Sequence, residues 1–241
     1  MSTSKIEWTE KTWNPITGCT KYSSGCAHCY AETMANRLKA MGVKKYSNGF
    51  IPTMHEDSLD EPLKWKRPHT IFVCSMADLF HEAVTFEFID KVMETIKKTP
   101  WHRYQILTKR ANRMAEYFSS RDIPHNAWLG VTVEDKRAKH RIDTLRNLNS
   151  SIRFLSCEPL LEDLGELDLT NIDWVIVGGE SGVKARQVSP DWIRSIRDQA
   201  AKEKVPFFFK QWGTWGEDGI KRNKKANGKL LDGQIHHSMP T

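Results

Sequence analysis

The chain has 241 residues, of which 39% are hydrophobic and 10% aromatic, and its formal net charge is +6. These values exclude wholesale disorder and permit a sizeable core in one α/β barrel. The first ten residues are polar apart from Ile6 and Trp8, with no signal sequence, and no apolar run reaches membrane-spanning length. We therefore expect a cytoplasmic protein that has no membrane partner, in which free cysteines favour metal binding over disulfides.

The first distinctive segment is a Gly-, Ser- and Thr-rich loop over residues 13–30, which holds three of the five cysteines. Cys19, Cys26 and Cys29 follow the spacing C-x6-C-x2-C. We expect a short strand before this loop and a helix after it, from about Ala31 to Met41. Three thiolates that converge on one loop suit iron–sulfur or zinc chemistry.

Three interpretations of these cysteines stay open at this point. They could form one disulfide and leave a spare thiol, or hold structural zinc with His28 as the fourth ligand. They could also hold a 4Fe–4S cluster that leaves one iron open. Gly18 and Gly25 each precede a cysteine and let the backbone fold closely around a bound group.

Strands and helices alternate through the rest of the chain, after an irregular stretch over residues 42–69. Short apolar runs predict strands and apolar residues at helical spacing predict helices, whereas residues 158–173 lack a helical period. Ser189 is expected to cap a helix in which Pro190 is the first residue. The expected strands are 70–76, 104–108, 128–133, 152–156, 174–177 and 205–210, and the other helices are 86–98, 111–118 and 136–148.

This alternation predicts parallel strands joined by right-handed crossovers. With the strand before the cysteine loop, about seven such units are available. The expected fold class is α/β, a full or partial (β/α) TIM-like barrel over residues 1–212 as a single domain. Residues 213–241 are polar, basic and glycine-rich, which predicts a C-terminal tail or hairpin.

Polar side chains follow each predicted strand, at the edge where parallel barrels place their active sites. Among them we take Glu158, Lys210 and Gln211 as candidate catalytic residues. Cys74 and Cys157 are expected to be buried small hydrophobes, with a catalytic thiol as the alternative. The strand-end residues are Ser75, Asp78, Thr108, Lys109, Arg110, Thr132, Glu134, Glu158, Gly178, Gly179, Glu180, Ser181, Lys210 and Gln211.

The cysteine loop, with Tyr30 after the last cysteine and a helix beyond, resembles the cluster-binding loop of radical SAM enzymes. The first gap has six residues, whereas that superfamily commonly has C-x3-C-x2-C. More closely, three segments resemble a family of phage and prophage proteins with a three-cysteine motif, and this similarity covers nearly the whole chain. The segments are Trp-Asn-Pro-x-x-Gly-Cys at 13–19, Gly-Gly-Glu-Ser-Gly at 178–182 and Leu-Leu-Asp-Gly at 230–233.

The radical SAM resemblance implies that Cys19, Cys26 and Cys29 hold a 4Fe–4S cluster whose open iron chelates S-adenosylmethionine. The loop from Ser75 to Asp78 occupies the place that contacts the methionyl amino group in that superfamily. An electron donor such as a flavodoxin or a ferredoxin is implied as a partner.

Two further contacts with the cofactor have structural alternatives. Gly178, Gly179 and Glu180 could let the backbone approach the adenosyl part, or could simply form a tight turn. Thr132 and Glu134 could bind ribose hydroxyls, or form a salt bridge with Lys109 or Lys210.

Basic clusters lie at residues 64–67, 109–113 and 136–141. They suit a nucleic-acid backbone, with Lys136, Arg137 and Arg141 as candidate contacts, although charge runs on helices are usually solvated faces. The leading prediction is a radical-SAM-like enzyme with an unknown substrate, for which nucleic acid is the candidate. The alternative is a zinc-stabilised nucleic-acid-binding phage protein without catalytic activity.

Overall fold

The computed structural model describes residues 4 and 6–240. Residues 1–3 and 5 of the polar N-terminus, and residue 241 of the predicted tail, lie outside the described residues. The chain divides into two compact units, each considered by itself below. Unit 1 comprises residues 1–22, 29–130 and 148–151, and unit 2 comprises residues 23–28, 131–147 and 152–241.

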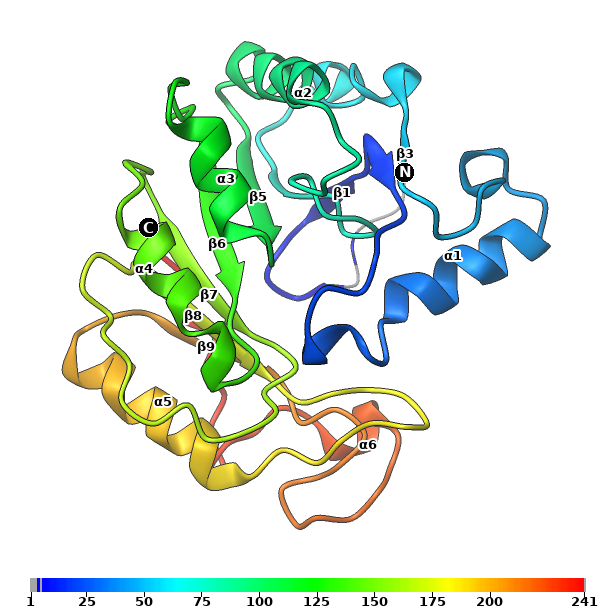
Figure 1. The fold of residues 1–241 in the computed structure, drawn as a ribbon. Coiled ribbons are helices and arrows are strands. Elements are labelled where there is room, and N and C mark those ends of the chain that lie inside the picture. Colours follow the sequence, from blue (N-terminus) through cyan, green and yellow to red (C-terminus); the bar gives the residue numbers. More distant parts are fainter. Residues whose placement is uncertain (1–3, 5, 241) are drawn as a thin grey trace. The chain divides into compact units, whose positions relative to one another are not determined.

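Seven strands form the main sheet, in the order β1-β4-β5-β6-β7-β8-β9 (Figure 1). The strands are β1 (Lys11–Trp13), β4 (Thr70–Val73), β5 (Arg103–Thr108), β6 (Ala127–Thr132), β7 (Arg153–Cys157), β8 (Trp174–Gly178) and β9 (Phe207–Gln211). In unit 1, β4 pairs in parallel with β1 and β5; in unit 2, β8 pairs in parallel with β7 and β9. The strand order runs from β1 to β9 without closing, which is a partial (β/α) barrel of the predicted class.

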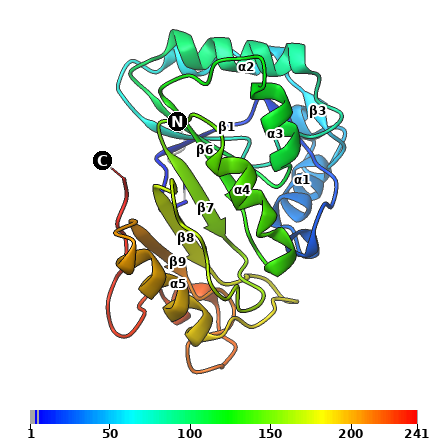
Figure 2. The same cartoon turned by 60° about the vertical axis from the view of Figure 1, so that its left-hand side comes forward.

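The helices follow the strands as the alternation predicts. Figures 1 and 2 show α5 running alongside β8 and β9. The α-helices are α1 (Tyr30–Ala40), α2 (Phe86–Lys98), α3 (Ala111–Phe118), α4 (His140–Arg146), α5 (Pro190–Lys202) and α6 (Lys224–Asn227). Short 3₁₀ segments are η1 (Ser24–Cys26), η2 (Lys44–Tyr46), η3 (Glu56–Ser58), η4 (Pro62–Lys64) and η5 (Lys136–Ala138). A small antiparallel pair joins β2 (Ile16–Thr17) to β3 (Thr53–Met54).

The predicted helices 86–98 and 111–118 are confirmed at both ends, and three other predictions differ in detail. The predicted helix 136–148 begins as η5, where the Asp135 side chain accepts a hydrogen bond from the Ala138 N–H at 3.2 Å. The predicted strand 70–76 ends at Val73, because Cys74 has φ +58° and turns the chain. Pro190 does begin α5, but the Ser189 side chain makes no capping hydrogen bond.

Each unit has a core built on large aromatic residues. In unit 1, Trp13 and Tyr104 are fully buried and their rings meet edge to face at 5.9 Å. In unit 2, Trp174 is fully buried between Phe154 and Phe208, with ring centroids 5.8 and 6.0 Å away. Burying such side chains supplies roughly 1.5–3 kcal/mol each, so these clusters fix the strands that carry the polar loops.

The C-terminal segment returns to the core of unit 2. The Phe209 N–H donates to the His236 carbonyl at 2.8 Å, and the ring of His237 stacks on Phe208 at 4.3 Å. Leu231 is fully buried. Residues beyond β9 therefore cover part of the sheet.

None of the helices in the described part of the chain has both the length and the apolar character that a membrane crossing requires.

Candidate functional site

In the cysteine loop, a tightly constrained glycine comes directly after β2. Gly18 has φ +79°, and a Cβ atom there would lie 2.3 Å from the carbonyl oxygen of Ile51. The Gly18 N–H donates to the Met76 carbonyl at 3.1 Å, and the Cys19 N–H donates to the Phe50 carbonyl at 3.0 Å. Only glycine fits this position, and the backbone bonds on either side fix where Cys19 begins.

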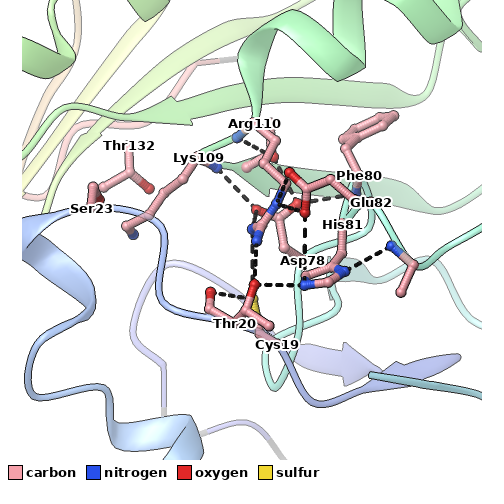
Figure 3. Close-up of polar contacts among 12 residues, drawn as sticks. Cys19, Thr20, Ser23, Asp78, Phe80, His81, Glu82, Lys109, Arg110 and Thr132 are labelled. Carbon is pink, nitrogen blue, oxygen red and sulfur yellow. Dashed lines mark hydrogen bonds and ion pairs between the residues drawn. The ribbon is translucent and has the colours of Figure 1, made fainter. Parts of the chain in front are cut away.

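Asp78 organises the loop after β4 in unit 1 (Figure 3). Its buried carboxylate accepts hydrogen bonds from the Thr108 hydroxyl at 2.7 Å, the Lys109 N–H at 3.1 Å and the Phe80 N–H at 3.0 Å. It also pairs with the Arg110 guanidinium at 3.2 Å. The carboxylate predicted to meet a cofactor is thus engaged by four protein donors, and it holds Arg110.

Ser75 lies at the end of the same strand. Its hydroxyl donates to the Asn14 side-chain oxygen at 3.1 Å, and that oxygen also accepts from the Met76 N–H at 3.2 Å. The Tyr30 hydroxyl donates to the Ser75 carbonyl. The loop after β4 is therefore tied to residues before and after the cysteines in unit 1.

The middle of the cysteine loop, residues 23–28, belongs to unit 2 and contacts the residues after β6. The Ser23 hydroxyl donates to Glu134, and the Ser24 hydroxyl donates to Asp135 at 2.5 Å. A Cβ atom on Gly25 would lie 3.2 Å from the Glu134 side chain. The glycine before Cys26 thus permits a close approach to Glu134.

Glu134 is fully buried and is paired with Arg141 at 2.8 Å. The Arg141 guanidinium also donates to the Thr132 carbonyl at 2.7 Å. The salt bridge therefore forms with Arg141, where the sequence suggested Lys109 or Lys210. Arg141, which the sequence offered as a nucleic-acid contact, has a side chain that is 5% exposed and neutralises this buried carboxylate.

Glu180 follows β8 and is held by Arg186. The guanidinium donates twice to the carboxylate, at 2.9 and 2.6 Å, and once to the Ser24 carbonyl at 3.0 Å. His28 Nδ1 lies 3.2 Å from the same carboxylate. Burial by itself raises the pKa of Glu180, but the bonds from Arg186 and His28 outweigh it, and the pKa lies below its usual value.

The glycines before Glu180 are explained by backbone packing. A Cβ atom on Gly179 would lie 1.9 Å from the carbonyl oxygen of Trp212, and one on Gly178 would lie 3.3 Å from Glu158. These contacts support the tight turn, which was one of the two readings of this segment.

Two of the three candidate catalytic residues, Glu158 and Lys210, meet at the ends of β7 and β9 in unit 2. The Lys210 ammonium donates to both Glu158 carboxylate oxygens, at 2.7 and 2.9 Å, and both side chains are 19% exposed. The Gln211 amide donates to the Ser181 hydroxyl at 3.1 Å. The pair is accessible enough for proton transfer and is held in one geometry by charge.

The five cysteines fall into two groups. None of them forms a disulfide: Cys19, Cys26 and Cys29 are partly exposed, while Cys74 and Cys157 are buried. Burial raises the pKa of both buried thiols, that of Cys157 to about 12, so they stay protonated and unreactive. Three accessible thiols in one loop are the donor set that an iron–sulfur cluster or zinc uses, although within the described residues no three metal-binding side chains converge.

Two arginines organise these loops: the sequence placed Arg110 at a strand end without indicating its role, and it did not single out Arg186. Arg110 stood in a basic cluster that suggested phosphate binding, yet it is buried beside Cys19. Arg186 gave no signal except a charge six residues after Glu180. Lys136 and Arg137 are exposed, and Arg137 pairs with Asp135 at 2.7 Å.

The open sheet of parallel strands is a partial (β/α) barrel with a radical-SAM-like fold. The chain belongs to the family described as "Protein of unknown function (DUF5131)", whose model matches residues 3–240. No curated protein matches the chain.

Solved structures of spore photoproduct lyase are similar in fold. A single-site mutant has a TM-score of 0.54 at 15% identity, over 96% of this chain and 73% of that one. The enzyme complexed with dinucleoside spore photoproduct gives 0.47 at 13%, over 83% and 63%. A double mutant with bound AdoMet and the same photoproduct gives 0.46 at 12%, over 83% and 63%. This chain spans 63% of the length of either complex, and the similarity concerns the fold alone.

Proposed function

We propose that this protein is an iron–sulfur enzyme of the radical SAM type that acts on nucleic acid. The observation that carries the proposal is the segregation of its thiols. Three partly exposed cysteines that form no disulfide share the loop over residues 13–30, which follows the first strand of a radical-SAM-like barrel, and the other two are buried. The residue types fit a cluster, because thiolates are its usual protein ligands.

Cys19, Cys26 and Cys29 would hold a 4Fe–4S cluster and leave one iron for S-adenosylmethionine. When bound, the cluster supplies the electron that cleaves this cofactor and starts radical chemistry. The chain's own residues form the loops after the strands. Ser75 lies in the loop after β4, and Gly178 and Gly179 lie where β8 ends. Asp78, Glu134 and Glu180 fix those loops through Arg110, Arg141 and Arg186.

Lys210 and Glu158 are the proposed proton-transfer pair, because their charges meet at 2.7 Å and both remain partly exposed. Gln211, the next residue in β9, is proposed as the third catalytic residue. Lys136 and Arg137 are proposed phosphate contacts, because both are exposed and the chain is basic. A fold neighbour is named spore photoproduct lyase, and that name supports nucleic acid as the substrate class of this protein. A flavodoxin or a ferredoxin in the cytoplasm is the proposed electron donor.

The first experiment is metal analysis of protein purified without oxygen. We expect brown protein with about four irons and four acid-labile sulfides per chain. Cys26→Ala should lose the iron, whereas the matched control Cys157→Ala should keep it, because Cys157 is buried away from solvent. Colourless protein with one tightly bound zinc would overturn the proposal in favour of the zinc-stabilised nucleic-acid-binding alternative.

A second experiment separates a radical SAM enzyme from another iron–sulfur protein. S-adenosylmethionine added to the reduced protein should change its electron paramagnetic resonance spectrum, since the cofactor would bind the open iron. An unchanged spectrum with full iron content would mean that the protein holds the cluster but does not bind S-adenosylmethionine there.

A further inference from the structure

Arg110 is a buried cation at the start of α3, and its side chain is 3% exposed. Its guanidinium makes an unusually complete set of contacts within unit 1 (Figure 3). Nε donates to both oxygens of Glu82 at 3.0 and 2.8 Å, and Nη1 donates to Asp78 at 3.2 Å. Removing a cation from water is costly, so these two carboxylates are needed to keep it charged there.

The remaining donors of Arg110 point to the cysteine loop. Nη1 lies 3.6 Å from the sulfur of Cys19, within the range of a hydrogen bond to sulfur, and Nη2 donates to the Thr20 hydroxyl at 3.1 Å. The Tyr22 ring packs against the guanidinium at 4.8 Å. One side chain thus contacts three of the four residues from Cys19 to Tyr22.

The orientation of Arg110 is fixed by partners other than the cysteine. Asp78 is itself held by Thr108, Lys109 and Phe80, so it cannot follow the guanidinium away from its place. Thr20 is bonded to His81 at 2.9 Å as well as to Arg110. A guanidinium locked in this way offers a preorganised N–H to one particular sulfur.

The geometry points to Arg110 as a positioning residue that donates a charged hydrogen bond to the Cys19 sulfur and raises the reduction potential of the centre bound there. This inference rests on the proposed function, since it requires that Cys19 ligate a redox-active cluster. The physical reason is that reduction adds negative charge to the cluster and its sulfurs. A cation and an N–H···S bond stabilise that added charge, which favours the reduced form.

The test compares Arg110→Gln with wild-type protein, both loaded with iron, in a redox titration followed by electron paramagnetic resonance. We expect the iron content to be kept and the midpoint to fall. At the wild-type midpoint potential, the ratio of reduced to oxidised cluster should drop at least tenfold, which is about 59 mV for one electron. Arg113→Gln is the matched control on the same helix, because Arg113 donates to the Val84 carbonyl and should leave the midpoint unchanged.

Arg110→Lys provides a second variant in case the glutamine variant fails to fold. Lysine keeps the charge but loses the planar fork, so its midpoint should lie between wild type and the glutamine variant. An unchanged midpoint in a folded, iron-loaded Arg110 variant would overturn the inference while leaving the proposed function intact. Wild-type protein without iron would instead overturn the proposed function.

Discussion

Gly179 lies where β8 ends and the chain has no room for a side chain. The nearest obstacle is the backbone carbonyl of Trp212, which a Cβ atom would approach to 1.9 Å. Backbone cannot swing aside as the end of a flexible side chain can. The neighbouring Gly178 has more space, since its nearest obstacle is the side chain of Glu158 at 3.3 Å.

We predict that Gly179→Ala destabilises the protein by roughly 1–3 kcal/mol, the usual range for overpacking. Gly178→Ala is the matched control and should cost clearly less, because the Glu158 side chain can shift by a few tenths of an ångström. Urea denaturation of both variants measures the difference. An equal loss of unfolding free energy in the two variants would mean that the Trp212 carbonyl is not the reason why residue 179 must be glycine.

At the same scale, thiol labelling should distinguish the two groups of cysteines. In metal-free native protein we expect a thiol reagent to modify Cys19, Cys26 and Cys29, which are partly exposed. Cys74 and Cys157 should react only after unfolding, because burial raises their pKa and the thiolate is the reactive form. Mass spectrometry of the labelled peptides identifies the sites. Rapid labelling of Cys157 in the native protein would contradict its burial in the folded structure.

Between elements, paired charges in unit 2 hold the segment 23–28. Arg186 joins the loop after β8 to this segment, because it contacts both Glu180 and the Ser24 carbonyl. Glu180 in turn lies beside His28. The carboxylate is therefore the group through which the loop after β8 and the cysteine segment stabilise one another.

The pH dependence of Glu180→Gln tests this pairing. The pKa of Glu180 is lowered in the folded protein, so its contribution to stability is present above its unfolded pKa, about 4.3, and is lost as pH falls through the folded pKa. At pH 7 the variant should lose about 2 kcal/mol, the scale of hydrogen bonds to charged groups. Denaturation curves should converge below pH 4. A difference that stays constant through the acid range would reject the linkage.

Local signals made the elements predictable, and long-range pairing made the site harder to predict. Apolar residues at helical spacing located α2 and α3 at both ends, because each helix buries one face. The strand-end rule located Asp78, Glu134, Glu158 and Glu180 as a set. Their partners depend on tertiary structure: Arg110 and Cys19 are 91 residues apart, and Arg186 and Ser24 are 162 apart. No periodicity or spacing connects such positions.

For the whole molecule, the net charge of +6 is modest and the basic residues are not equivalent. Several basic residues form ion pairs with carboxylates inside their own unit, as Arg110 and Arg141 do. Such residues cannot release counterions from a nucleic acid. Only exposed cations such as Lys136 and Arg137 can contribute to the salt dependence of binding.

We therefore predict that the double variant Lys136→Ala/Arg137→Ala weakens duplex binding and flattens its salt dependence. Each phosphate contact contributes about 0.9 to the slope of log K against log salt, so the slope should fall by roughly 1.8. Lys97→Ala/Lys98→Ala removes the same charge from the end of α2 and is the matched control, with an unchanged slope expected. Arg141 is left intact, because its loss would leave the buried Glu134 without its ion-pair partner and would mix a loss of stability with a loss of binding.

Fluorescence anisotropy with single- and double-stranded DNA over a salt series measures the slopes. Equal slopes for the two double variants would show that Lys136 and Arg137 do not contact phosphate. An affinity of the wild-type protein that does not change with salt concentration would exclude nucleic acid as the substrate class.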